Sequence, residues 1–334
     1  IMGADGGVLR RTKYPNTRKD ANIFIDSLAE YDCVAACEST ARMWIKTYEE
    51  FERRGIPITL ANPHRLKMSQ SGVKTDKIDA QKLANKLRLN DIPACYVLGP
   101  EARRTMDILR QRVLLVQERT RYLNRQHSIL DKYDYAVKAG SSTSSERHQA
   151  YLDSLKLGPG DMVLMAQYIR AVRHINEEIS LLERMIARAA YESEYARIIM
   201  SLPGFDAFGA LLVAVAIEDI GRFKNGKSLV SFMGLCPRVY QSGDRNTHGR
   251  MKKNADRTLT WVMMNAAMVA KQHDPYLAAF YEGHAKRHHP MIARSHLANK
   301  MATYTRHMLS KNELYRHVNT KSYETKLARL KAPL

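Results

Sequence analysis

The residues with the clearest chemical potential are two carboxylates near the start of a predicted helix, Asp76 and Asp79. Thr75 is a good N-cap residue, and apolar residues recur at helical spacing after it. Side chains three positions apart lie on one face of a helix, so the two carboxylates could share a divalent cation. Acids in a first turn also complement the helix dipole, and the pair alone leaves both explanations open.

A third carboxylate, Glu38, closes the apolar stretch 33–38, which predicts a short buried strand. Ligands of open α/β sheets gather at the carboxyl ends of strands, and the loop before Asp76 leads out of another predicted strand. Glu38, Asp76 and Asp79 could therefore converge on one sheet edge. Their mutual repulsion would then require Mg²⁺, or Mn²⁺ in its place, between them. The alternative for Glu38 is an N-cap acid of the following helix.

Ser242 lies in the polar, basic segment 237–257, which we predict to be a loop. A serine among cations could attack a phosphodiester, because the cations stabilise the negative charge that develops. Ser242-Gly243 is also a common turn sequence, so the residues alone leave both roles open. The cations of this segment that could bind backbone phosphates are Arg238, Arg245, Arg250, Lys252, Lys253 and Arg257.

The sequence Leu202-Pro203-Gly204-Phe205 separates two predicted helices within residues 195–220. This arrangement is similar to a helix-hairpin-helix unit, whose glycine turn lets backbone N–H groups at a helix start meet a phosphate. Gly204 is therefore a candidate nucleic-acid contact. The alternative is an ordinary pair of packed helices.

The charge balance predicts a polyanionic partner. Lys and Arg number 53 against 34 Asp and Glu, a formal net charge of +19, and nucleic acid is the commonest partner of such a protein. Residues 285–334 are the most one-sided part, and they either lie along phosphates or form a solvated tail. His284, His288 and His289 have a spacing that could suit a metal, although in so basic a region we favour contacts to phosphate or solvent.

The remaining pattern divides the chain into three predicted domains, 1–99, 100–194 and 195–334. In the first, strands alternate with helices and end with a short strand over 94–97, which is typical of an α/β domain with a mixed sheet. In the second, two long stretches of a/d apolar residues predict an antiparallel coiled-coil arm that folds on itself or pairs with another subunit. The third is mainly helical, with an apolar core helix over 259–271.

The sequence has no eighteen-residue apolar stretch and no charged-then-apolar leader, which favours a soluble protein over a membrane protein. We therefore expect a cytoplasmic protein with no membrane partner. The four cysteines form no CxxC pair, so the sequence indicates neither a zinc ribbon nor a disulfide framework.

Several motifs together resemble the DEDD-type transposases of insertion sequences that are guided by a bridge RNA, a family with the pilin-gene invertases as relatives. The resemblance extends along essentially the whole chain, and the motifs follow the family's order. They are Cys37-Glu38-Ser39-Thr40, Lys74-Thr-Asp-Lys-Ile-Asp-Ala80, Leu202-Pro-Gly-Phe205, and the block with Phe232-Met-Gly-Leu235, Gln241-Ser-Gly243 and Gly249-Arg-Met-Lys-Lys253.

The resemblance implies a RuvC-like (RNase H-like) N-terminal domain whose four acids bind Mg²⁺. Glu38, Asp76 and Asp79 match the second, third and fourth of these acids. It also implies that Ser242 attacks DNA and forms a covalent phosphoserine link. In the family a noncoding guide RNA pairs with target and donor DNA, and the coiled coil helps to join protomers, here a dimer or tetramer, around a composite site.

One departure concerns the family's first acid, which lies on a first strand that is absent here. Asp5, in a predicted turn, is a poor substitute, and we expect a chain truncated at its N-terminus by roughly one strand and part of the next. Two alternatives to RNA-guided recombination therefore stay open. One is an RNA-independent site-specific invertase or junction nuclease, and the other is a nucleic-acid-binding remnant without strand-transfer activity.

Overall fold

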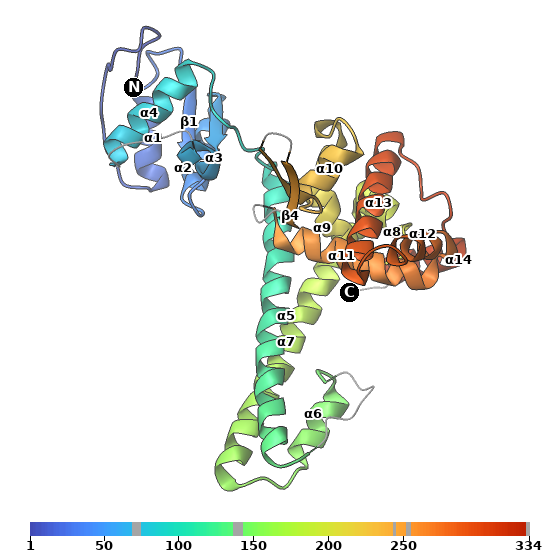
Figure 1. Cartoon of the computed structure of the whole chain (residues 1–334). Coiled ribbons are helices and arrows are strands. Elements are labelled where there is room, and N and C mark those ends of the chain that lie inside the picture. The colour runs from blue at the N-terminus through green and yellow to red at the C-terminus, as the bar shows by residue number, and fades with distance from the viewer. Residues whose placement is uncertain (69–74, 136–142, 243–244, 252–254, 332–334) are drawn as a thin grey trace. The chain divides into compact units, whose positions relative to one another are not determined.

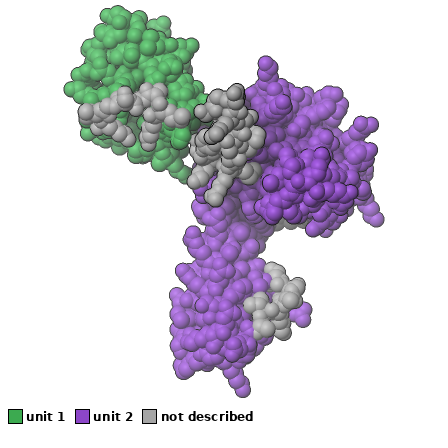
Figure 2. Space-filling view, viewed as in Figure 1, with its two compact units in different colours: residues 1–97 green, residues 98–334 purple. Residues whose placement is uncertain are grey.

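The computed structural model describes residues 1–68, 75–135, 143–242, 245–251 and 255–331. The chain forms two compact units, residues 1–97 and 98–334 (Figure 2). The predicted division of the second unit into an arm and a C-terminal domain stays a prediction.

The first unit combines a small parallel sheet with helices (Figure 1). Strands β1 and β2 pair in parallel, with Glu38 beside Ala61 at their carboxyl ends. Helices α2 and α4 pack against β1, and α1 packs against α2. The elements are α1 (Arg18–Asp26), β1 (Ala35–Glu38), α2 (Trp44–Arg53), β2 (Ile58–Ala61), α3 (Pro63–Met68) and α4 (Asp76–Arg88).

The sheet described for this unit is smaller than the sequence pattern predicts. The predicted strand 94–97 contributes one antiparallel bridge, between Ala94 and Ala61. Pro93, directly before it, has no N–H to donate and a fixed φ, which limits further pairing. The N-terminal residues likewise form one bridge, between Met2 and Val8, around the predicted turn.

The second unit is helical apart from one strand pair, among the residues that the structure describes (Figure 1). Its elements are α5 (Pro100–Lys132), α6 (Glu146–Asp153), α7 (Pro159–Glu192), α8 (Glu194–Met200), α9 (Ala207–Ile217), η1 (Ile220–Arg222), α10 (Gly226–Phe232), β3 (Pro237–Ser242), β4 (Arg245–Met251), α11 (Arg257–His273), α12 (Pro275–Ala285), α13 (Pro290–Lys311) and α14 (Thr320–Lys331).

Helix α9 occupies the centre of the main core. Its sequence, Ala-Phe-Gly-Ala-Leu-Leu-Val-Ala-Val-Ala-Ile, is apolar on every face, and a helix of that kind must be surrounded. Helices α5, α7, α8 and α11 pack around it. At its end, the Glu218 carboxylate accepts a hydrogen bond of 2.8 Å from the N–H of Gly99, the N-cap residue of α5. The core and the start of the long helix are thereby linked.

The long helices α5 and α7 pack against each other, as Figure 1 shows. Their far ends share a second apolar cluster with α6, a helix that the sequence pattern did not predict. Gln126 and Gln149 are buried there, and Nε2 of Gln126 donates a hydrogen bond of 2.6 Å to Oε1 of Gln149. The coiled-coil character of the two helices stays a prediction.

The predicted loop over 237–257 is wrong for most of its length. Strands β3 and β4 pair antiparallel, with Ser242 opposite Arg245 and Val239 opposite His248. The segment is polar, but it includes β-branched and aromatic residues, which favour strands once the backbone groups find cross-strand partners. The polar and basic composition of this segment therefore led to the wrong prediction of a loop.

Candidate active site and nucleic-acid interface

The start of α4 agrees with the sequence prediction. Thr75 has an extended backbone, and its side chain accepts a hydrogen bond of 3.3 Å from the N–H of Ile78. Asp76 and Asp79 then lie in the first turn. Helix α4 packs against β1, the strand that ends in Glu38. Local capping and this packing together position the three predicted carboxylates within one unit.

The three carboxylates are accessible to an ion. Glu38 and Asp76 are exposed, and Asp79 is half-buried. Their oxygens do not form a group in which all lie within 4.8 Å of one another, although all three residues are described. Like charges without a cation between them repel, so a wider spacing is the expected arrangement. A donor set made only of carboxylate oxygens suits a hard cation such as Mg²⁺ or Mn²⁺.

Asp5 is held in its own turn. Its Oδ1 accepts a hydrogen bond of 2.9 Å from the N–H of Gly7, and the residue is exposed. The bend closes further through a hydrogen bond of 2.8 Å from the N–H of Gly3 to the carbonyl of Gly7. This carboxylate stabilises the turn locally, as expected of an acid at that position.

The β3–β4 hairpin holds most of the second set of predicted residues. Ser242 is the last residue of β3, and Arg245, its partner in the register, is the first of β4. The other predicted cations of the described segment are Arg238 on β3, Arg250 on β4 and Arg257, which begins α11. Lys252 and Lys253 lie outside the described residues. The hairpin therefore brings the backbone positions of Ser242 and Arg245 side by side.

The turn between α8 and α9 fits closely against α11. Gly204 has a φ of +90°, in the left-handed region that favours glycine. A Cβ atom at this position would lie 2.2 Å from the carbonyl oxygen of Ala266. Gly204 is thus needed for a close backbone approach to α11, whether or not it also contacts a phosphate.

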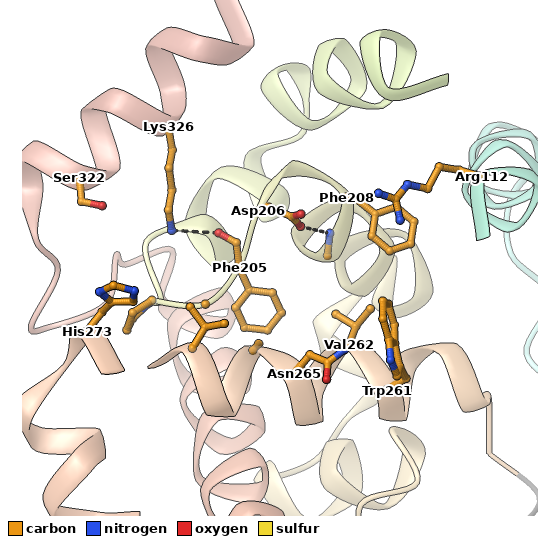
Figure 3. Close-up of a pocket in the computed structure, with 15 residues that line it drawn as sticks. Arg112, Phe205, Asp206, Phe208, Trp261, Val262, Asn265, His273, Ser322 and Lys326 are labelled. Atoms are coloured by element: carbon orange, nitrogen blue, oxygen red, sulfur yellow. Dashed lines mark hydrogen bonds between the residues drawn. The ribbon is translucent and has the colours of Figure 1, made fainter. Parts of the chain in front are cut away.

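A cavity of about 520 Å³ opens beside this turn (Figure 3). The carbonyls of Met200 and Phe205 accept hydrogen bonds of 3.1 and 2.9 Å from Nζ of Lys326. Burial lowers the pKa of this ammonium group. Asp206 caps α9, since its carboxylate accepts from the N–H of Gly209 at 2.7 Å. In a helix-hairpin-helix unit, the N–H groups at this helix start would meet a phosphate. Here a carboxylate accepts a hydrogen bond from one of them.

The opposite wall of the cavity presents rings and a guanidinium group (Figure 3). The Arg112 guanidinium lies 4.5 Å from the ring centroid of Phe208, and it is paired with Glu183 at 2.7 Å. The residue Trp261 is 52% exposed. This corrects the prediction that the whole helix over 259–271 is core, because one face of α11 stays accessible.

Sequence reasoning missed several residues with potential roles. Trp261 and Lys326 could not be assigned, because an apolar helix and a basic tail do not reveal which side chains reach a cavity. The histidines of the C-terminal region form a different group from the predicted one. His289 caps α13 through Nδ1, which accepts from the N–H of Met291 at 3.2 Å. His296, which was not predicted, takes its place in the cluster.

Two family models match the chain in succession. A DEDD transposase model of the IS110 group matches residues 1–134, and the model described as "Transposase IS116/IS110/IS902 family" matches residues 196–282. The first match covers the three carboxylates and the second covers the Leu202–Phe205 turn, Ser242 and Trp261. No helix within the described ranges has the length and apolar character that a membrane crossing requires.

Curated relatives that the chain resembles are also insertion-sequence or family 20 transposases, at 24–25% identity. The transposase for insertion sequence element IS1328 of Yersinia enterocolitica is 25% identical over 81% of this chain and 81% of its own length. The transposase for insertion sequence element IS1111A of Coxiella burnetii is 25% identical over 80% of this chain and 76% of its own. A probable family 20 transposase of Pseudomonas aeruginosa is 24% identical over 85% and 86%.

Proposed function

The chain belongs to the IS116/IS110/IS902 transposase family, and from this premise we propose that it is an RNA-guided DNA recombinase with a serine nucleophile. The proposal depends chiefly on one observation. A capped helix start presents Asp76 and Asp79, and this helix packs against the strand that Glu38 closes. A DEDD domain of this family acts on DNA and generally uses divalent metal ions.

In this proposal Glu38, Asp76 and Asp79 hold the divalent cation, Mg²⁺ or in its place Mn²⁺. When bound, the ion supplies Lewis-acid stabilisation of a phosphoryl oxygen. The protein orients the site: Thr75 fixes the first turn of α4, and the β1–β2 pairing fixes the end of the strand with Glu38. The exposure of Glu38 and Asp76 leaves room for a DNA phosphate.

The covalent step belongs to Ser242. Its Oγ attacks the phosphorus of the scissile phosphodiester and gives up its proton as the new P–O bond forms. The bond from phosphorus to one deoxyribose oxygen breaks, and that oxygen leaves as a protonated hydroxyl. Arg245 is opposite Ser242 in the backbone register, and in this proposal it balances the developing negative charge. Attack of the freed hydroxyl of another strand on the phosphoserine would reverse the step and exchange the strands.

The other partners follow from charge and architecture. We propose that Arg238, Arg250 and Arg257, with the flanking Lys252 and Lys253, bind backbone phosphates of target and donor DNA. The net charge of +19 favours polyanionic partners in general, and we propose that a noncoding guide RNA is one of them. The long helices α5 and α7 would act as a coiled coil that joins a homo-oligomer, either a dimer or a tetramer. Gly204 would bring its turn close to a phosphate.

Trapping the covalent adduct tests the serine directly. Purified protein, guide RNA and a donor-junction DNA with Mg²⁺ should give a DNA-linked protein band that survives denaturation. Ser242→Ala should abolish the band, whereas Ser180→Ala, at an exposed site on α7, should leave it unchanged. An undiminished band from Ser242→Ala would refute the role of this serine.

The carboxylates are tested in the same assay. Asp76→Asn and Asp79→Asn should each lower the initial rate of adduct formation by at least about 100-fold, a loss of about 2.7 kcal/mol of transition-state stabilisation. Asp153→Asn, on the exposed side of α6, is the matched control. Adduct formation that needs Mg²⁺ but no RNA would favour the RNA-independent invertase or junction nuclease. Tight DNA and RNA binding with no adduct under any condition would favour the binding remnant.

A further inference from the structure

Three imidazole rings meet where α12 ends and α13 begins. His284 lies in the last turn of α12, His288 in the connecting residues, and His296 in the second turn of α13. One ring nitrogen from each lies within 4.8 Å of the corresponding nitrogens of the other two. Among the described residues, no other group of three or more His, Cys, Asp or Glu has ligand atoms this close together.

The rings face one another without sharing hydrogen bonds. His284 and His296 stack at 4.5 Å between centroids, and the centroids of His288 and His296 are 5.7 Å apart. Nδ1 of His284 is buried and has no hydrogen-bond partner. A buried nitrogen without a partner is costly, and a bound ligand would remove that cost. A metal ion bound through this nitrogen would remove that cost.

We propose that His284, His288 and His296 form a binding site for a transition-metal ion of the Zn²⁺ class, separate from the carboxylate site. Three imidazoles are the donor set of many Zn²⁺ sites, and the same donors suit Mg²⁺ poorly. The site needs no help from the unit that contains Glu38, Asp76 and Asp79. The two sites would therefore hold ions of different chemistry.

The present geometry lies close to the required one. Zn–N bonds of about 2.0–2.1 Å at a tetrahedral centre place the ligand nitrogens about 3.3 Å apart. Nitrogens that already lie within 4.8 Å reach this spacing by small side-chain rotations that unstack the rings. Three protein ligands leave a fourth position open. His288 is exposed, so that position is accessible to water.

The surroundings favour a metal over a phosphate. A metal ion binds the neutral form of an imidazole, in which one ring nitrogen carries no proton. Lys286 and Arg287 in the connection are exposed and can turn toward solvent. Phosphate would instead need protonated rings, and three cationic imidazoles at this spacing would repel one another.

A bound ion would tie the α12–α13 connection to the body of α13. The connection follows α12, whose C-cap is Lys286, and ends at the N-cap of α13, His289. An ion that binds only the folded state stabilises that state by about 2.7 kcal/mol when the free metal concentration is 100 times the Kd. The proposed role of the ion is therefore to fix the junction of two helices in the basic C-terminal region.

The test uses the tag-free full chain, stripped of metal with a chelator and titrated with Co²⁺. We expect one equivalent to produce the intense visible d–d absorption of a tetrahedral site, and Zn²⁺ to displace it. His288→Gln and His296→Gln should each weaken Co²⁺ binding by more than about 100-fold, because even changes outside the ligand set cost about 10–100-fold. His307→Gln, at an exposed position on the same helix, should bind like the parent.

Thermal unfolding separates the remaining outcomes. Zn²⁺ should raise the Tm of the parent and of His307→Gln, but not that of His288→Gln. Since His288 is exposed, this variant should fold even if His296→Gln does not. The proposal is overturned if the parent gives no tetrahedral Co²⁺ spectrum, or if His288→Gln binds Co²⁺ as the parent does. It is also overturned if inorganic phosphate, and not Zn²⁺, raises the Tm in a manner that requires His288.

Discussion

The two units of the molecule are stabilised by different means. The second unit has a large apolar core around α9, in which Leu211, Val213 and Ile217 are almost completely buried. The first unit has a much smaller core, with Ile25, Leu28 and Phe51 as its buried cluster. Each large apolar side chain contributes about 1.5–3 kcal/mol when fully buried, so burial favours the second unit strongly.

The first unit compensates with polar contacts between its helices. Glu50 is 5% exposed and accepts hydrogen bonds of 3.0 Å from both Arg18 and Arg53. Arg54 pairs with Asp26, which links α2 to α1 again. The predicted metal ligands therefore lie on the unit held by caps and ion pairs. The backbone of a unit held in this way can shift when a cation draws three carboxylates together, whereas a close-packed core resists such a shift.

Substitution of Gly204 should give the largest effect and should affect the second unit alone. Gly204→Ala forces a residue with a Cβ to a φ of +90° and places that atom 2.2 Å from the Ala266 carbonyl oxygen. Relief requires α11 to move away from the turn, and we expect a loss of about 3 kcal/mol or more. Urea unfolding monitored by hydrogen exchange should show faster exchange in peptides of α9 and α11.

Gly160→Ala is the matched control, because a Cβ at Gly160 meets nothing within 4 Å and its φ is not positive. It should change the free energy of unfolding by no more than about 0.5 kcal/mol. If Gly204→Ala were equally mild, the turn would not be held against α11. The contrast drawn between a rigid second unit and an adjustable first unit would then lose its main support.

The effect next in size concerns Glu50 and should affect the first unit. Glu50→Gln removes the charge that receives Arg18 and Arg53, and we expect a loss of about 1–1.5 kcal/mol, since both arginines can return to water. Hydrogen exchange should quicken in α1 and α2 and stay unchanged in α9. Glu30→Gln, at an exposed position after α1, should leave both units unchanged.

The contribution of Glu50 also depends on pH. Burial acts to raise the pKa of this carboxyl, but the hydrogen bonds from Arg53 and Arg18 outweigh it, and the pKa lies below its ordinary value of 4.5. A depressed carboxyl pKa stabilises the fold at pH values above 4.5 and loses that effect as the pH falls toward the folded-state value. The difference in stability between the parent and Glu50→Gln should therefore shrink below pH 4.5. A constant difference down to pH 3 would contradict this account.

Local signals predicted the helix starts better than the sheet. Thr75 caps α4 as expected, because a cap depends on residues within one turn. The apolar runs similarly predicted α5, α7 and α9. The hairpin of β3 and β4 was missed, since strand pairing depends on a partner that composition does not reveal. The predicted strand over 94–97 is wrong for most of its length. Of these four described residues, only Ala94 takes part in a β-bridge, with Ala61.

The candidate site shows the same division. The spacing of Asp76 and Asp79 was sufficient to place both in one turn, and family likeness identified Ser242 as a candidate nucleophile. The histidine cluster could be recognised only from the structure. His296 contributes to it from the second turn of α13, whereas His289, next to His288 in the sequence, serves as the N-cap of α13. Side chains that meet across a helix junction leave no fixed spacing in the sequence.

The smallest expected effect connects stability to the proposed chemistry. Thr75→Ala removes the hydroxyl that accepts from the N–H of Ile78, at a cost of about 1 kcal/mol or less in local stability. Fraying of this turn should raise the Mg²⁺ concentration needed for half-maximal adduct formation by roughly fivefold, because Asp76 and Asp79 must first be ordered. Thr75→Ser retains a hydroxyl cap and should restore the parent's Mg²⁺ dependence. A uniform loss of yield at every Mg²⁺ concentration would instead mean that Thr75 acts outside the metal site, and the carboxylates would then not depend on the helix start for their position.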